Sequence, residues 1–359
     1  MKKIRILSGL MAVVMLLSLM AVNVFAADSG KVVLSDVPFD YMTNMQTRSF
    51  DSYENLSTPN KKLVYSIPDG VAKTLTTEAL LETILNNKYI VDLFAYDSFE
   101  YAVTLKESQF KILEFLDRED SNEVLSSYIE KYQNLLAEKE LKYNLYLKDI
   151  TSLEVVSNLP NDYSHIILQI ELMKQMQGII SPKISENNII QRASNDCYIT
   201  TKGGRAVAAR ENQTWTQLLI PEFMAQIVEN DYIEEYPNNI EVSGISPVYN
   251  CHSYAWHSQN INTNKFWVFN ADLYYAEATS ATQNPQVGTK VCYFNYYTEN
   301  GSTVNKLDHS ALVYSLKSNG DVNKVISKWG HCGLFIHSIE DSPYWNAETN
   351  LTSLAYRNY

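Results

Sequence analysis

The sequence predicts an α+β protein, in which an N-terminal helical domain precedes a C-terminal domain with one cysteine-bearing helix packed on an antiparallel β-meander. Residues 31–185 carry apolar side chains at helical spacing. Residues 241–359 instead contain short β-branched and aromatic runs separated by turn residues. With 359 residues, the chain is also longer than a typical domain of about 100–150 residues. We therefore expect two domains.

Three helices account for most of the helical domain, residues 31–185. Thr76 is placed to cap the first helix, and Ser121 begins an amphipathic second helix. The third helix starts near residue 161 and is expected to stop at Gly178 and Pro182. The acidic residues of this domain occupy solvent-facing helix positions, so we expect no chemistry here.

A connecting segment, residues 186–240, follows the helical domain. It begins with a hairpin about Gly203–Gly204 and continues as a helix. Residues 241–359 then hold the cysteine-bearing helix, four strands with a tight turn at Asn319–Gly320, and a fifth strand near the end. The predicted strands are VGTKVCYFNYYT, HSALVYSLK, NKVISKWG, GLFIHS and LAYRN.

Residues 1–26 have the pattern of a bacterial secretory signal peptide. Lys2, Lys3 and Arg5 precede an apolar run, and VFA at Ala26 forms a cleavage site. An uncleaved membrane anchor is the alternative. No second apolar run of spanning length follows. We expect a secreted, extracellular protein without stable membrane insertion, released or held loosely at the cell surface.

Charge and cysteine content exclude several classes of protein. The net charge is −12, and removal of the basic leader makes it more negative, which argues against nucleic acid as a partner. Four cysteines are too few for a disulfide framework in a chain of this size, and no CxxC pair suggests a zinc ribbon. We expect no cofactor and no metal. The cysteines are Cys197, Cys251, Cys292 and Cys332.

The stretch NCHSYAWHS, residues 250–258, is the densest group of reactive side chains. Asn250 is a good cap for a helix whose first turn holds Cys251. A helix N-terminus lowers the pKa of a thiol, and its unpaired N–H groups can stabilise an oxyanion. A buried structural thiol, a disulfide or a metal ligand are the alternatives. His252 and His257 do not form a metal pair, because helical ligand pairs are three or four residues apart.

A nucleophilic cysteine needs a base from elsewhere in the fold. His252 points about 100° away from its neighbour on a helix, so it is a poor partner. His309 begins a predicted strand and shares a face with Ala311 and Val313, which suits a face packed against a helix. His309 is therefore our first candidate and His337 the second. The alternative for His309 is an ordinary strand histidine.

The order of four motifs from Tyr249 onward resembles a known family. YNCHSYAW, GTKVCYFN, HSALV and SKWG are similar to divergent papain-like cysteine peptidases and amidases of the NlpC and CHAP types. The resemblance implies a papain-like domain with Cys251 as nucleophile and His309 as base. The helical domain resembles an accessory module in secreted proteins of Gram-positive bacteria.

The resemblance also implies a third group that orients the histidine from the next strand. Those families use Glu, Asn, Gln or His, whereas this strand offers Ser327, Lys328 and Trp329. Ser327 can accept a hydrogen bond from the imidazole, but an ammonium has no acceptor and disfavours imidazolium. Asn323, His337 or a backbone carbonyl are the alternatives. Trp329 either lines a groove or packs in the core.

The predicted function is hydrolysis of an amide bond, in a peptide or a peptidoglycan stem peptide, through a Cys251 thiolate and a His309 base. A transglutaminase-like acyl transferase is one alternative, with Asp321 as the only acid at a suitable distance from the histidine. A non-catalytic extracellular binding protein on a papain-like shell is a second one. We expect a peptide or peptidoglycan-like partner.

Overall fold

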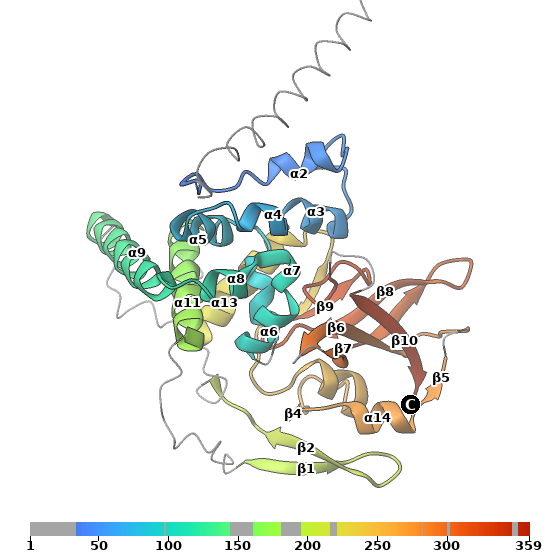
Figure 1. Cartoon of the computed structure of the whole chain (residues 1–359). Coiled ribbons are helices and arrows are strands. Elements are labelled where there is room, and N and C mark those ends of the chain that lie inside the picture. The colour runs from blue at the N-terminus through green and yellow to red at the C-terminus, as the bar shows by residue number, and fades with distance from the viewer. Residues whose placement is uncertain are drawn as a thin grey trace, which may run out of the picture.

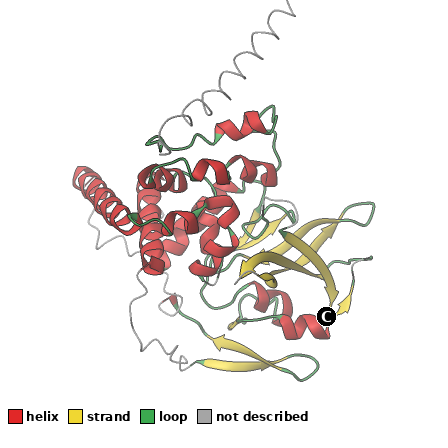
Figure 2. Ribbon diagram, in the orientation of Figure 1, coloured by secondary structure: helices red, strands yellow, loops and turns green. Residues whose placement is uncertain are grey.

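A computed structural model describes residues 34–96, 98–143, 161–180, 195–215, 221–281, 283–299, 302–346 and 351–359. Helices fill the N-terminal half and antiparallel sheets dominate the C-terminal half, which confirms the mixed fold class (Figures 1 and 2). The predicted signal peptide and the predicted boundary at residues 185–186 lie outside the described residues.

Two of the three predicted helices in the N-terminal half begin where their capping residues predict. The Thr76 hydroxyl accepts a hydrogen bond from the Ala79 N–H at 3.2 Å, and Ser121 begins a helix of 23 residues. The third predicted helix runs two residues past Gly178. The helices are α2 (Met42–Thr47), α3 (Thr58–Val64), α4 (Asp69–Ala72), α5 (Thr77–Leu85), the 3₁₀ helix η1 (Ile90–Ala95), α6 (Phe99–Leu105), α7 (Glu107–Phe110), α8 (Ile112–Leu116), α9 (Ser121–Tyr143) and α11 (Asn161–Ile180).

The C-terminal half contains α13 (Glu222–Glu235), the π-helix η3 (Ser253–His257), α14 (Asp272–Glu277) and two sheets. The smaller sheet has the order β1 (Asp196–Thr200), β2 (Ala206–Glu211), β4 (Phe266–Val268). The larger sheet has the order β3 (Ile240–Ser243), β9 (Leu334–His337), β8 (Val322–Lys328), β7 (Ser302–Leu316), β6 (Lys290–Glu299), β10 (Thr352–Asn358), β5 (Thr279–Ser280).

The five predicted strands are all present, as β6 to β10. The predicted hairpins are also present, and their glycines adopt the left-handed conformation that a side chain disfavours, with φ of 83° at Gly204 and 88° at Gly320. The edge strands β3 and β5 were not predicted. Strand β10 returns to pair with β6 instead of extending the meander beyond β9.

The two faces of the larger sheet pack against different layers. Because side chains alternate along a strand, Tyr293, Ala311 and Val313 share one face and join the hydrophobic core of the N-terminal helices. Cys292 and Leu312 lie on the other face and pack with the aromatic residues of η3. The N-terminal helices and the sheet therefore share one continuous core.

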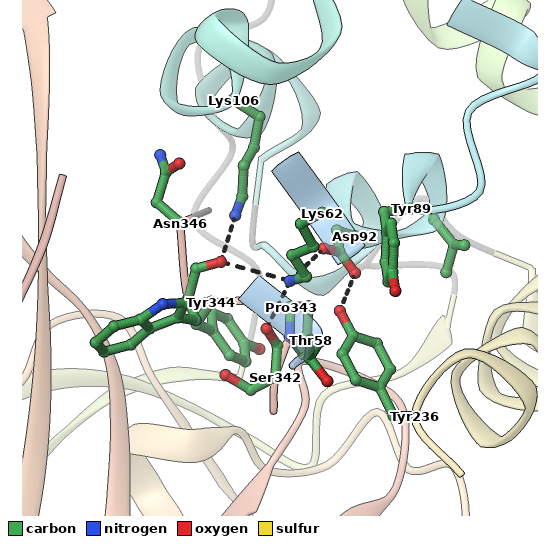
Figure 3. A network of polar contacts seen from close by, with 12 residues as sticks. Thr58, Lys62, Tyr89, Asp92, Lys106, Tyr236, Ser342, Pro343, Tyr344 and Asn346 are labelled. Carbon is green, nitrogen blue, oxygen red and sulfur yellow. Dashed lines mark hydrogen bonds and ion pairs between the residues drawn. The ribbon is translucent and has the colours of Figure 1, made fainter. Parts of the chain in front are cut away.

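A buried charge network connects the N-terminal helices to the loop between β9 and β10 (Figure 3). The Lys62 ammonium lies 2.8 Å from Asp92 and donates a hydrogen bond of 2.8 Å to the Ser342 carbonyl. Tyr236, which directly follows α13, donates to the other oxygen of Asp92 at 2.8 Å. The network thereby holds the segment 342–346, which carries Tyr344.

Candidate active site

Cys251 lies at the start of the helical turn that leads into η3. The Asn250 side chain caps this turn, because its Oδ1 accepts from the Ser253 N–H at 3.1 Å. The same amide donates to the Val268 carbonyl at 2.8 Å, which fixes the helix start against β4. The turn continues as a π-helix, a conformation that is frequent at functional sites.

Cys251 lines a cavity of about 50 Å³ whose walls come from both halves of the chain. Gly330 closes one wall with φ of 53°, and a Cβ there would lie 2.7 Å from the Ala95 carbonyl oxygen. The N-terminal half is thus part of the site. The lining residues are Ala95, Tyr96 and Tyr101 from the N-terminal half, and Asn250, Cys251, His252, Phe269, Asn270, Asp272, Lys306, Leu307, Asp308, Gly330 and Tyr344 from the C-terminal half.

His309 is fully buried on β7 and stacks on Tyr344. The two ring centroids are 3.6 Å apart and the ring planes differ by 10°, while Tyr293 meets the imidazole edge-on at 5.1 Å. Within the described residues neither ring nitrogen of His309 has a hydrogen-bond partner, so the imidazole is not hydrogen-bonded to the Cys251 thiol. Burial holds the pKa of His309 well below its usual value, which keeps the ring neutral.

The cysteine-bearing helix contacts β7 through Ser310 instead of His309. The Ser310 hydroxyl lies 3.0 Å from His252 Nδ1 and accepts from Trp256 Nε1 at 2.8 Å. The face that His309 shares with Ala311 does pack against helices, as predicted, but they are the N-terminal helices. The expectation that this face meets the cysteine-bearing helix is therefore wrong. Burial lowers the pKa of His252 to about 4.

Ser327 does not orient His309 in this structure. Its hydroxyl lies 2.7 Å from Nε2 of His337, whose Nδ1 lies 2.8 Å from the Ser338 carbonyl. The second candidate base is therefore engaged as well. Trp329 is buried in the core, where its ring centroid lies 4.4 Å from that of Phe335. It is not among the residues that line the cavity.

Neither Asn323 nor Asp321 orients the His309 imidazole. Asn323 is exposed and its amide bonds the Ser315 hydroxyl at 3.3 Å. Asp321 is exposed in the turn before β8, where its carboxylate accepts from the Asn319 amide at 2.7 Å. The turn geometry gives no support to Asp321 as the acid of an acyl transferase.

Lys328 is fully buried at the end of β8, beside the loop that carries Gly330. Its ammonium donates hydrogen bonds to the carbonyls of Ser246 at 3.2 Å, Gly330 at 3.1 Å, and Cys332. Burial lowers the pKa of Lys328 to about 8, while negative charge on neighbouring groups, Cys251 among them, acts in the opposite direction. Cys332, four residues after Lys328, is also buried.

Most of the residues that line the cavity were missed by reasoning from the sequence, and three of them bear on its chemistry. Tyr344 links the two candidate catalytic residues, because it lines the Cys251 cavity and stacks on His309. Tyr101 of α6 donates a hydrogen bond to Asp308, and burial raises the pKa of that carboxyl to about 6. Asp308 immediately precedes His309, which was an available signal, whereas the tyrosines belong to segments with no local motif.

Among the described residues, no group of three or more His, Cys, Asp or Glu side chains is placed to hold a metal ion, and no disulfide occurs. None of the helices in the described ranges combines the length and apolarity needed to cross a membrane. Comparison of the chain with models of protein families, with curated proteins and with solved structures finds no match.

Proposed function

We propose that this protein is a secreted cysteine hydrolase that cleaves an amide bond of a peptide or a peptidoglycan-like stem peptide. Cys251 would be the nucleophile and His309 the base. One observation carries the proposal: Cys251, at a capped helix start, lines a cavity whose wall residue Tyr344 stacks on a buried imidazole without hydrogen bonds. The helix start that bears Cys251 packs on an antiparallel meander that bears His309 on its opposite face. The order of these elements along the chain supports a papain-like relationship.

The unmet hydrogen bonds of His309 favour a functional role for this residue. Each buried polar atom without a partner costs about 1–3 kcal/mol, so nitrogens left in this condition need an explanation. A neutral imidazole can accept a proton. Because catalytic hydrogen bonds are often long or absent before substrate binds, we propose that His309 engages Cys251 or the leaving group when the cavity is filled.

The proposed reaction uses an acyl-enzyme. The Cys251 thiolate attacks the carbonyl carbon, and His309 takes up a proton from solvent as the cavity fills. The C–N bond breaks as His309 passes this proton to the leaving amine. Water then attacks the thioester, giving up a proton to His309, and the carboxylic acid departs with the thiol restored. Backbone N–H groups at the start of the cysteine-bearing helix would stabilise the oxyanion, as such groups do in other acyl transfers.

The test is release of new amino groups from defined peptides and from soluble peptidoglycan fragments. We expect Cys251→Ser and His309→Ala each to reduce turnover by at least about 10³-fold. Cys332→Ser is the matched control, because Cys332 is buried and does not line the cavity. Unchanged turnover in Cys251→Ser would exclude Cys251 as the nucleophile.

A non-catalytic binding protein is the second candidate, and two observations favour it. The Cys251 thiol and the His309 imidazole are not hydrogen-bonded, and Ser327 is committed to His337. This candidate predicts that fragments bind the wild-type protein and Cys251→Ala equally, by calorimetry, and that no amine is released from any of them.

A further inference from the structure

The environment of Lys328 is unusual because every hydrogen bond described for its buried ammonium goes to a backbone carbonyl. The carbonyls of Ser246, Gly330 and Cys332 accept its three N–H groups. Within the described part of the chain, no carboxylate lies within ion-pair distance of it. A buried ammonium bonded only to neutral groups keeps its charge uncompensated.

Two of these carbonyls belong to the segments that border Cys251. Ser246 lies in the chain that leads into the cysteine-bearing helix, and the Tyr249 ring in that same segment is 5.3 Å from the ammonium. Gly330 lines the cavity together with Cys251. The contacts of β8 with η3 bring the cysteine-bearing helix against the strand that carries Lys328.

The other titratable groups around Lys328 are poor counter-ions at neutral pH. Burial raises the pKa of Glu229, on α13, to about 8, and Glu241 of β3 adds to that rise. Burial raises the pKa of the Cys332 thiol well above its usual value. Burial and the charge of Lys328 lower the pKa of His331 to about 3, so this ring is neutral. Of the two thiols whose negative charge raises the pKa of Lys328, Cys251 lines the cavity and Cys332 does not.

We propose that Lys328 is the positioning charge that holds Cys251 in its thiolate form before substrate binds. Cys251 gives up its S–H proton to solvent through the cavity, and no bond to Lys328 forms or breaks. The ammonium thus takes the role that a cationic histidine has in other thiol hydrolases, which His309, being neutral, does not fill. This inference rests on the proposed function, because it concerns the nucleophile of the same site.

The test is the pH dependence of Cys251 alkylation by iodoacetamide, followed by mass spectrometry of the intact full-length protein and its peptides. We expect the wild-type rate to reach half its maximum at least one pH unit below the value of about 8.5 for an ordinary thiol. In Lys328→Met the midpoint should rise by at least one unit, with about a tenfold loss of rate at pH 7. Lys328→Arg, if folded, should restore the low midpoint.

Lys306→Met is the matched control. Lys306 also lines the cavity, but it is exposed and its ammonium lies 4.0 Å from the Tyr101 ring, so the midpoint should not move. A purely structural role for Lys328 would change the melting temperature and leave the alkylation midpoint unchanged. Equal midpoints in the wild type and Lys328→Met would overturn the inference.

A second measurement covers the case in which Lys328→Met fails to fold. A wild-type alkylation midpoint at or above the value of about 8.5 for an ordinary thiol overturns the inference without any variant. Alkylation needs no substrate, so the two proposals fail separately. A low, Lys328-dependent midpoint without amide hydrolysis refutes only the proposed function, whereas Cys251-dependent hydrolysis with an unaffected midpoint refutes only the role of Lys328.

Discussion

Lys62 and Lys328 are both fully buried lysines, yet their surroundings differ in one respect. Lys62 lies 2.8 Å from the carboxylate of Asp92, so its charge is matched (Figure 3). Lys328 donates its hydrogen bonds to backbone carbonyl oxygens, and no carboxylate of the described residues pairs with it. The first arrangement joins helices to a loop, and the second leaves a positive field beside a cavity. A buried charge with a carboxylate partner therefore stabilises the fold, whereas one without such a partner can act on a neighbouring reactive group.

The same contrast extends to the groups around each lysine. Around Lys62 the hydrogen bonds hold α3, η1 and α13 to the segment 342–346. Around the cavity, His309 has no hydrogen bond to either ring nitrogen, and the carboxyl of Asp308 has a raised pKa. Buried groups with unmet hydrogen bonds or shifted pKa values lower the stability of the fold. They are expected at functional sites, where the protein uses these groups.

The largest effect is expected at the matched pair. Lys62→Met leaves the Asp92 carboxylate buried without its partner, which should lower the free energy of unfolding by about 3–5 kcal/mol. Urea denaturation measures this loss. The alkylation midpoint of Cys251 in the folded variant should stay at the wild-type value, because Lys62 belongs to the charge network with Asp92 and not to the groups around Lys328.

The double variant Lys62→Met, Asp92→Leu is the control for that experiment. Replacing both members with apolar side chains removes the isolated charge, so most of the lost stability should return. A loss below about 1 kcal/mol in the single variant would mean that the two buried lysines are not energetically distinct.

A smaller, pH-dependent effect is expected at Asp308. Its carboxyl has a pKa of about 6 in the folded protein, against about 3.9 in an unfolded chain. The folded state therefore holds this proton more tightly, and the wild type loses stability as the pH rises through 6. Asp308→Asn should be more stable by about 1–2 kcal/mol at pH 8, with the gain gone near pH 4.

Urea midpoints at pH 4, 6 and 8 measure the gain in Asp308→Asn. Asp272→Asn removes an exposed acid from the same cavity and should change stability by less than about 0.5 kcal/mol. A gain in Asp308→Asn that is as large at pH 4 as at pH 8 would contradict the assignment of the buried proton to Asp308.

The smallest change in stability is expected at His309. Phenylalanine can keep the stack on Tyr344 while removing both nitrogens, so His309→Phe should fold within about 1 kcal/mol of the wild type, or be more stable. Turnover should nevertheless be lost. A marked destabilisation together with retained turnover would assign His309 a structural role.

Much of the fold could be predicted because local patterns determine it. Alternation and turn residues identified β6 to β10, and the caps Thr76 and Asn250 identified two helix starts. Strand β5 was missed because it has only two residues, and β3 because its four residues are mostly exposed and show no alternation of burial. Strands this short at a sheet edge carry too little alternation to stand out.

The candidate site could be predicted only in part. Cys251 was found because its signal, a capped helix start, is local. Alternation correctly grouped His309 with Ala311, but it cannot tell which of two helical layers covers that face. Tyr101 and Tyr344 reach the cavity through tertiary packing, so no pattern near either residue marks it.

The network around Lys62 also has a consequence for the order of folding. Lys62 bonds the Ser342 carbonyl across 280 residues of sequence. Contacts this distant close large loops and are expected to form late. Tyr344, which borders Cys251 and stacks on His309, lies in the segment that these contacts secure. We therefore expect the reactive thiol to acquire its surroundings only in the last steps of folding.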